Sequence, residues 1–281
     1  MEKRFLYIIV GLVIVALCVI VFLWSSQSPT VKAQLVIDSG TVQVKHADGV
    51  WDSADNGMLL FSDDTVKTGD NTSASIILFE SNVIRLDSNT EVTLKEVMRQ
   101  AEAINVKIQQ DEGRVWYRVS KISGIDTYEV QTPVAVASVR GTSFFIRVHT
   151  NKTTIVGVGT GIVNVSRINL TQLQNFITLI KNESVIVDPN AFDQPLKITS
   201  FEQDEWFLEN LQKDGELTVI DKGELYERIG PYIPQLKEKY GVSDQELEVL
   251  IDAYLRGDFS LPSDTPDWIR RLFESSSVGV S

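Results

Sequence analysis

The sequence predicts a mainly β protein with an N-terminal transmembrane helix and a small α-helical region at its C-terminal end. Residues 5–24 carry no charge, residues 35–200 alternate between apolar and polar side chains in short runs, and later apolar residues recur at helical spacing. The expected parts are a cytoplasmic N-terminus (1–4), a transmembrane helix (5–24), a linker (25–34), a β domain (35–200) and an acidic helical region (201–281).

The uncharged segment is long enough to cross a membrane. At 1.5 Å per residue, the 20 residues of segment 5–24 span about 30 Å, the thickness of the bilayer hydrocarbon core. Lys3 and Arg4 precede the segment and no basic residue follows before Lys32, so the positive-inside rule places the N-terminus in the cytoplasm and the bulk of the chain outside.

A cleaved signal peptide with a processing site at residues 31–33 is the alternative. A cleavable apolar run is shorter than this one and lies close to its processing site, whereas here about nine residues intervene. We therefore expect a single-pass anchor in the cell membrane, with lipid contacts through residues 5–24.

Short runs with a period of two follow, separated by Gly, Asn, Asp and Ser. Gly40, Gly113 and Gly161 each open a Gly-x-Val-x pattern, but their irregular spacing argues against a strict solenoid. We expect a compact sandwich-like or β-helix-like stack of short strands. The predicted strands are 35–37, 41–45, 73–79, 83–86, 91–97, 104–109, 114–119, 128–132, 134–137, 144–148, 153–158 and 162–166, with closing strands at 176–180, 184–187 and 196–199.

Two extended runs meet at a sharp corner within residues 131–148. Pro133 fixes its own φ and pushes the preceding residue into the extended region, while Gly141 lacks a Cβ and suits a corner or a bulge. Apolar side chains recur at every second position on both sides of the corner. The residues singled out as a ligand site or a structural corner are Thr132, Pro133, Arg140, Gly141, Thr142 and Phe144.

Arg140 has two interpretations. Its guanidinium could clamp an anionic ligand or partner, or it could hold a carboxylate and backbone carbonyls at the corner. Because an unpaired buried charge is costly and a corner needs fixed donors, we favour the structural interpretation.

The corner also carries a resemblance to a known family. Thr-Pro followed by an apolar run, and then Val-Arg-Gly-Thr-Ser-Phe and a further strand, resembles the hallmark of the FecR domain. The resemblance spans roughly residues 35–200, because further segments occur in the order that the family shows. These segments are Gly40-Thr-Val-Gln-Val, Trp51, Gly57-Met-Leu-Leu, Asp64-Thr-Val-Lys-Thr-Gly69, Ser75-Ile-Ile-Leu-Phe, Ile84-Arg-Leu, Asn89-Thr90, Gly113-Arg-Val-Trp and Gly161-Ile-Val-Asn-Val.

The resemblance implies an anchored extracytoplasmic β domain used for recognition. Members of the FecR family are membrane-spanning regulators that sense a loaded outer-membrane receptor and signal to a sigma factor through an N-terminal cytoplasmic domain. In this chain only residues 1–4 are expected in the cytoplasm, so we expect no direct binding to a sigma factor.

After Phe201 the apolar spacing becomes helical. Trp206 and Phe207 lie on the apolar side of the first helix, and Ser243 with Glu246 forms a capping box before another. The expected helices are 202–212, a stretch 223–240 broken at Gly230-Pro231 and Pro234, 244–255, and a last short helix that starts at Thr265-Pro266.

Charge and composition restrict the function. The formal net charge is −12, and residues 200–281 hold 18 Asp+Glu against 8 Lys+Arg, so −10 of this charge belongs to the tail. Nucleic-acid binding needs a basic surface, so we expect no nucleic-acid partner.

The sequence offers little catalytic or metal-binding chemistry. Cys18 is the single cysteine, and it lies in the apolar N-terminal run, which excludes an internal disulfide and a CxxC motif. His46 and His149 have no ligand partner at metal spacing. Segment 52–63 superficially resembles a calcium loop, but Ala54 replaces the acid at its third position. We therefore expect that the protein binds no metal and no cofactor and is not an enzyme.

Three functions compete. The favoured one is a non-enzymatic recognition or sensing module that binds a protein or envelope polymer through strand edges or loops, with the acidic tail as a second contact surface. The second is a self-associating scaffold of the cell envelope. The third is a hydrolase that uses acid pairs such as Asp63-Asp64 or Asp111-Glu112, although solvated turns explain these acids better.

Overall fold

The structure is a computed structural model that describes residues 33–47, 49–79, 81–100, 103–123, 125–168, 176–191, 194–255, 261, 265–266, 269–270 and 273. These residues belong to one compact unit, Val31–Ser281. The predicted membrane segment 5–24 lies outside the described residues. Within the described part of the chain, no helix is both long and apolar enough to span a bilayer.

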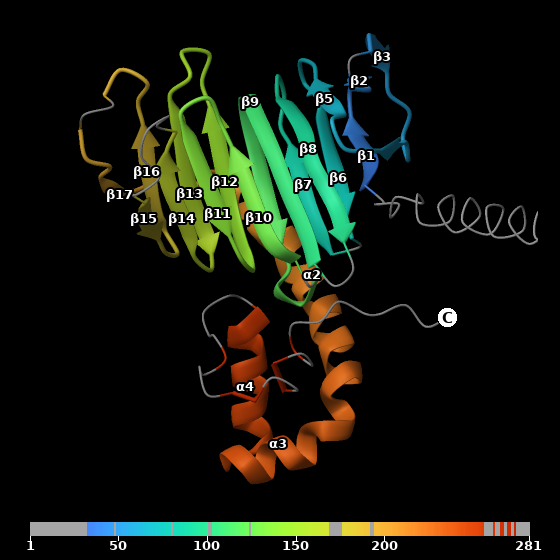
Figure 1. Cartoon of the computed structure of the whole chain (residues 1–281), viewed down its shortest axis with the longest axis vertical. Coiled ribbons are helices and arrows are strands. Elements are labelled where there is room, and N and C mark those ends of the chain that lie inside the picture. The colour runs from blue at the N-terminus through green and yellow to red at the C-terminus, as the bar shows by residue number, and fades with distance from the viewer. Residues whose placement is uncertain are drawn as a thin grey trace, which may run out of the picture. The chain divides into compact units, whose positions relative to one another are not determined.

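Two sheets that share one long strand, β9 (Ala103–Val119), form the β domain (Figure 1). Sheet A contains, in spatial order, β17 (Ile198–Ser200), β16 (Glu183–Val187), β13 (Thr154–Thr160), β12 (Thr142–Val148), β9, β7 (Asn82–Leu86), β6 (Ser73–Leu78), β1 (Ala33–Ser39) and β4 (Leu59–Leu60). Sheet B contains β15 (Phe176–Leu179), β14 (Val163–Arg167), β11 (Ala135–Val139), β10 (Ile125–Gln131), β9, β8 (Glu91–Gln100), β5 (Thr65–Thr68), β2 (Val42–Lys45) and β3 (Trp51–Ser53). The described pairings are antiparallel except that between β9 and β10.

Strand β9 crosses from one sheet to the other near Gly113. Its first part pairs with β8 and β10, and its part from Gly113 onward pairs with β12 in sheet A. Gln110 is fully buried at this crossing, where its side-chain amide donates to the carbonyls of Gly113 (3.0 Å) and Ile146 (3.2 Å) and accepts from the Tyr117 hydroxyl (3.0 Å). One buried amide therefore satisfies the polar groups that the bend would otherwise leave unpaired.

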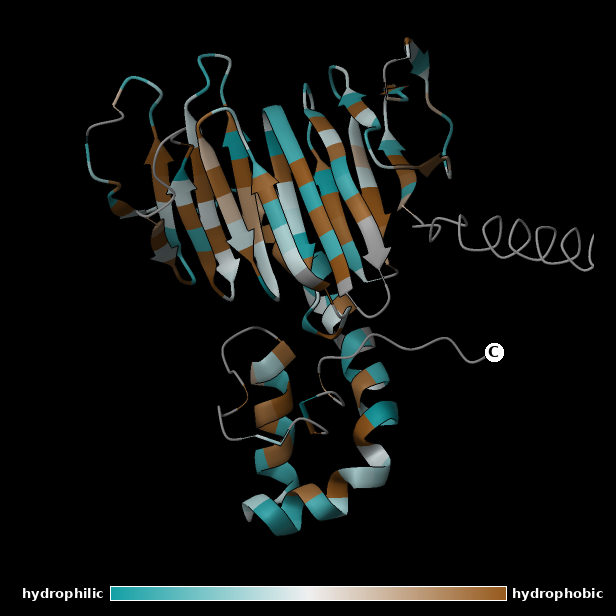
Figure 2. Cartoon of the chain, in the orientation of Figure 1, coloured by the Kyte–Doolittle hydropathy of each residue, from teal (hydrophilic) through white to brown (hydrophobic). Residues whose placement is uncertain are grey.

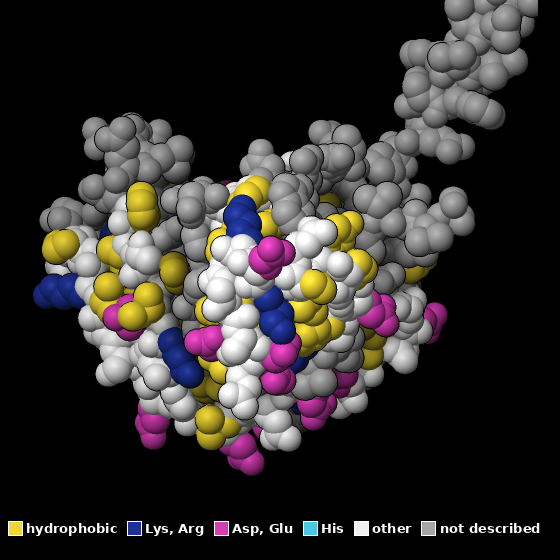
Figure 3. All heavy atoms as spheres, turned by 90° about the horizontal axis from the view of Figure 1, so that it is seen from below, with side chains coloured by type: hydrophobic (Ala, Val, Ile, Leu, Met, Phe, Trp, Pro, Cys, Tyr) yellow, Lys and Arg dark blue, Asp and Glu magenta, His cyan; other side chains and the backbone are white. Residues whose placement is uncertain are grey.

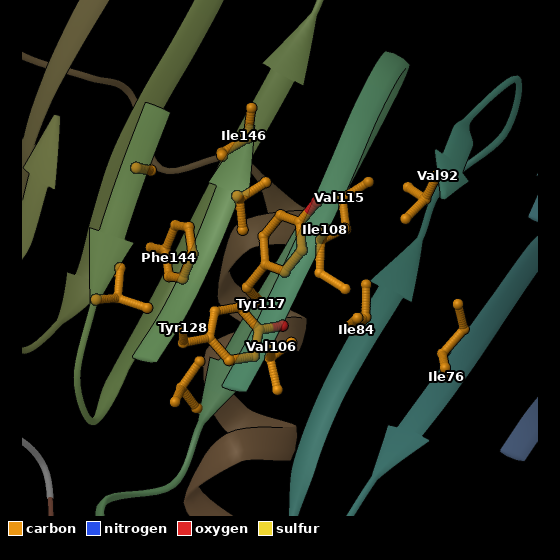
Figure 4. Close-up of a cluster of buried hydrophobic side chains, with 14 of the residues drawn as sticks. Ile76, Ile84, Val92, Val106, Ile108, Val115, Tyr117, Tyr128, Phe144 and Ile146 are labelled. Atoms are coloured by element: carbon orange, nitrogen blue, oxygen red, sulfur yellow. The ribbon is translucent and has the colours of Figure 1, made fainter. Parts of the chain in front are cut away.

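The core lies between the two sheets, and Figure 4 shows part of it. Apolar and polar side chains alternate along the strands, as Figure 2 shows by colour, so that one face of each sheet turns inward. Phe144 of β12 stacks on Tyr117 of β9 with ring centroids 5.0 Å apart, and Tyr128 of β10 meets Tyr117 edge to face. Burial raises the pKa of both tyrosines, so their hydroxyls stay neutral.

The prediction of a mainly β protein is confirmed, and the strands form two facing sheets over one core. The predicted separate strands 104–109 and 114–119 are wrong, because the chain stays extended through its polar turn-like residues and forms the single strand β9. The short strands β3, β4 and β5 were not predicted. They contain two to four residues, too few to show a period. Strand β3 forms by pairing with its neighbour β2, and β4 and β5 form by pairing with strands that are more distant in the sequence.

The helical region contains α2 (Glu205–Ile229), the 3₁₀ turn η2 (Gly230–Tyr232), α3 (Ile233–Tyr240) and α4 (Asp244–Leu255); a further 3₁₀ turn, η1 (Lys121–Ser123), follows β9. The capping box is confirmed, since Ser243 N–H donates to Glu246 Oε2 at 2.9 Å and Glu246 N–H to Ser243 Oγ at 3.3 Å. Of the predicted last helix, Thr265 and Pro266 are described and lie outside a helix, whereas Ile269, Arg270 and Phe273 are described and are helical.

The first predicted helix is too short, because α2 continues through Gly215 and Gly223 to the predicted break at Gly230. A glycine costs a helix interior roughly 1 kcal/mol, an amount that tertiary packing readily offsets. Here Asp204 caps the first turn by accepting from Phe207 N–H at 2.9 Å, and Leu225 is fully buried near the other end of the helix.

Helix α2 docks on the outer face of sheet A through two buried ion pairs. Arg85 of β7 contacts Asp214 at 2.6 Å, and Arg118 of β9 contacts Asp221 at 2.5 Å. The four side chains are at most 13% exposed, so both pairs are removed from water. Trp116 Nε1 also donates to Asp214 at 2.8 Å.

Aromatic side chains fill the remaining space between α2 and sheet A. Trp116 and Phe145 of the sheet pack against Phe207 of α2, with the Trp116 and Phe207 ring centroids 5.2 Å apart. Gly157 and Gly159 of β13 make room for these rings, because a Cβ at Gly157 would lie 2.4 Å from the Phe145 ring. The predicted apolar stripe of this helix thus meets a matching outer face of the sheet.

The remaining part of α2 joins a second core within the helical region. Leu225 and Ile229 are fully buried there with Leu236 of α3 and Ile251 of α4. Ile122, which follows β9 directly, inserts into the same cluster. The β domain therefore contacts the helices in two places: at the buried ion pairs of α2 and at the apolar cluster around Ile122.

We predict that Asp221→Asn lowers the free energy of unfolding by about 3–5 kcal/mol, because it leaves the Arg118 charge buried without its counter-ion. Urea denaturation followed by circular dichroism measures this change. Glu91→Gln is the matched control: it breaks the exposed Lys67–Glu91 pair and should cost less than about 1 kcal/mol. Equal effects of the two substitutions would contradict the assigned role of the buried pair.

Candidate recognition site

The Thr-Pro pair forms the turn between β10 and β11. Thr132 is buried, and its Oγ1 accepts from the Ala135 N–H at 2.9 Å and the Thr154 hydroxyl at 3.1 Å. The exposed Pro133 continues the turn. The threonine hydroxyl therefore links the turn between β10 and β11 to strand β13.

Arg140 and Gly141 form the predicted corner, where the chain passes from β11 of sheet B to β12 of sheet A. Gly141 has φ +66°, and a Cβ on it would lie 1.8 Å from Lys121 Cγ, so only glycine fits this corner. The next residues of the motif, Thr142 and Phe144, are buried. The structure thus places Arg140, Gly141, Thr142 and Phe144 at one end of β11 and the Thr132-Pro133 turn at its other end.

Arg140 is exposed at this corner, and both interpretations of its guanidinium stay predictions. A cavity of about 390 Å³ opens beside it, between the corner and the helical region. Lys121, Arg140 and Arg270 line this cavity together with polar Ser138 and Asn164. The Lys121 ammonium lies 4.6 Å from the centre of the Tyr254 ring, a cation–π contact that links the corner to α4.

A second surface lies at the sheet ends formed by β15, β16 and β17, on the left of Figure 1. Among the described strands, β15 pairs with β14 alone and β17 with β16 alone, so each presents an open edge. An open edge offers unpaired backbone donors and acceptors to an added strand. The geometry required for strand addition is therefore present at this end.

Large apolar side chains are exposed around these two edges. Phe176 is 62% exposed, Ile186 53% and Ile198 47%, and Ile180 at the connecting turn is 52% exposed. In Figure 3 hydrophobic side chains appear among Lys and Arg side chains at the same end of the β domain. We name β15, β16, β17 and the Ile180 turn the open end. Exposed apolar groups beside free strand edges are typical of a protein-binding surface.

The acid pairs considered as catalytic groups serve local structure. Asp64 is buried, accepts from the Phe61 N–H at 2.8 Å and lies 3.0 Å from His46 Nδ1. Asp111 accepts from the Gln109 amide, and Glu112 accepts from the Thr150 hydroxyl. In the described part of the chain, no group of three His, Cys, Asp or Glu side chains could hold a metal ion. These contacts give the hydrolase alternative no support.

The open end was not identified as a site from the sequence. Segment 176–180 was predicted as a closing strand, and its alternation gave no sign that one edge stays unpaired. Edge position depends on which distant strands pair, so a local period cannot report it. One sequence signal was available: Phe176 and Ile186 are apolar, although they lie at outward-facing positions of the alternating strand pattern.

Comparison with known proteins agrees with the motif. Residues 64–164 match the family described as FecR protein, which confirms the resemblance to the FecR domain in the central part of the chain. Two crystal structures of a candidate anti-sigma factor from Parabacteroides distasonis ATCC 8503 are similar to the chain, each with 20% identity and a TM-score of 0.39. The match covers 49% of this chain and 60% of the other, so it spans less than two thirds of that protein's length. Comparison with curated proteins gives no match.

We predict that Phe144→Ala lowers the free energy of unfolding by about 3–5 kcal/mol, because it empties a fully buried ring position. Arg140→Ala should change it by less than about 1 kcal/mol, since the side chain is exposed. Urea titration of both variants tests this difference. An Arg140→Ala loss as large as that of Phe144→Ala would contradict this prediction and support the structural interpretation of the arginine.

Proposed function

We propose that this chain, whose residues 64–164 form a FecR-type domain, is a membrane-anchored recognition or sensing module that binds a protein partner outside the cytoplasm. The observation that carries the proposal is the open end, where two free strand edges carry exposed apolar side chains. The partner adds a strand to β15 or β17 and covers the side chains beside it.

The position of α2 supports this choice of surface. Among the described residues, its contacts with sheet A involve β7, β9, β12 and β13. The buried ion pairs keep this helix on that part of the sheet. The strand edges of the open end are therefore available to a partner.

The anchor is part of the same proposal. Segment 5–24 crosses the membrane, Lys3 and Arg4 keep the N-terminus in the cytoplasm, and the FecR-type domain lies on the outer side. The module acts by binding, without chemical turnover.

A self-associating envelope scaffold is the second candidate, favoured by the other end of the β domain. Val50 is 74% exposed, Phe61 51% and Leu59 50%, and these residues lie near the short strands β3 and β4. Two apolar ends on one body permit head-to-tail contact between copies. Copurification of a differently tagged copy of the same chain would favour this candidate.

We predict that Phe176→Asp/Ile186→Asp reduces partner recovery at least tenfold when the full-length chain is used as bait in solubilised envelope membranes. The two carboxylates interrupt the apolar surface while leaving the core intact. Val249→Asp is the matched control, because Val249 is 65% exposed on α4, far along the chain from the open end. Equal recovery by all three proteins, or no recovered protein at all, would argue against binding at the open end.

We also predict that the chain stays in the membrane fraction after carbonate extraction and that protease added outside the inner membrane digests the FecR-type domain. The reason is the combination of an uncharged 20-residue segment with Lys3 and Arg4 directly before it and no basic residue after it before Lys32. A chain released by carbonate, or a domain protected until the membrane is lysed, would exclude the proposed orientation.

A further inference from the structure

The helical region contains an apolar cavity of about 310 Å³ that the recognition function does not use. It lies among α3, α4 and the described residues that follow them, and it is separate from the open end. Its aliphatic and aromatic lining includes Leu236, Val242, Leu247, Ile251, Ile269 and Phe273. Protein interiors are close-packed, and a space of this size is in the range of small-molecule sites.

Thr265 lines the same cavity and is 5% exposed. Its Oγ1 is buried, and in the structure as described it has no hydrogen-bond partner. A buried hydroxyl without a partner costs roughly 1–3 kcal/mol, so most buried hydroxyls in proteins are paired. The Thr265 hydroxyl can therefore form a hydrogen bond with a ligand in the apolar cavity.

The described lining is apolar apart from Thr265 and the tyrosine hydroxyls of Tyr240 and Tyr254. No charged side chain is among the described lining residues, so an ionised group inside would lack a counter-ion. The cavity selects for an aliphatic body with one uncharged oxygen.

We propose that this cavity binds a single aliphatic chain that carries an uncharged oxygen function, such as a hydroxyl or an ester carbonyl, held by a hydrogen bond to Thr265. The aliphatic ligand makes dispersion contacts with the side chains of the lining, and its oxygen forms a hydrogen bond with the buried Thr265 hydroxyl. A free fatty alcohol and an ester-linked acyl chain of a bilayer lipid share this chemistry.

Photolabelling of the full-length chain in phospholipid nanodiscs tests the proposal. One arm uses a diazirine-bearing fatty alcohol with a ten-carbon chain, and the other uses a phospholipid with the diazirine in its acyl chain. Both are read by mass spectrometry of the peptides that cover α3 and α4. Labelling by the alcohol alone identifies a free ligand, and labelling by the phospholipid identifies a bilayer source; either outcome supports the site.

Two variants and one control make the result specific. Leu247→Trp fills the cavity and should reduce labelling of these peptides at least tenfold. Thr265→Val keeps the side-chain shape and removes the hydroxyl, which should reduce labelling about threefold to tenfold. Thr150→Val, at an exposed turn of the β domain, should leave it unchanged. All variants are compared by circular dichroism with the parent protein.

Absence of label from the α3 and α4 peptides in both arms would overturn the proposal. Unchanged labelling in folded Leu247→Trp would show that the label lies elsewhere and would overturn it as well. Unchanged labelling in Thr265→Val would overturn the assigned hydrogen bond. Partner recovery through the open end is measured separately, so failure here leaves that function untouched.

Discussion

The buried arginine–aspartate pairs between sheet A and α2 are the interaction on which the arrangement of this protein depends. Arg118 and Asp221 are 4% and 5% exposed, and Arg85 and Asp214 are almost as fully covered. Removing four charges from water is costly, so such pairs contribute less net stability than their short distances suggest. Their effect is on specificity, because any other position of the helix leaves a buried charge without its partner. The position of α2 on the sheet is thereby restricted to one register.

The docking of α2 and the FecR-type motif both stabilise the fold. The FecR-type motif lies in turns and in the core, where Thr132 holds two strands and Phe144 stacks on Tyr117. A motif of this kind reports the fold more directly than a binding site. In the proposed function, the partner binds where the sheets end, apart from the motif.

The sequence allowed the period-two strands, the corner at Gly141 and the capping box of α4 to be predicted, because each depends on neighbouring residues. The continuity of β9 was missed, because its polar residues resemble a turn in the sequence. In the structure the Gln110 side chain donates to the Gly113 carbonyl at the bend of the strand. The burial of Asp214 and Asp221 in ion pairs was also missed, because their partner arginines are distant in the sequence. The open end and the apolar cavity also depend on contacts between distant segments, which a local pattern does not contain.

Hydrogen exchange of the native protein tests the central claim, that α2 and sheet A form one cooperative body. Amides of α2 and of the sheet A part of β9 should exchange with similar opening free energies, because the helix cannot leave without exposing two charged pairs. Weak protection throughout α2 beside strong protection in β9 would show that the helix detaches independently. That result would contradict the claim that α2 and sheet A form one cooperative body.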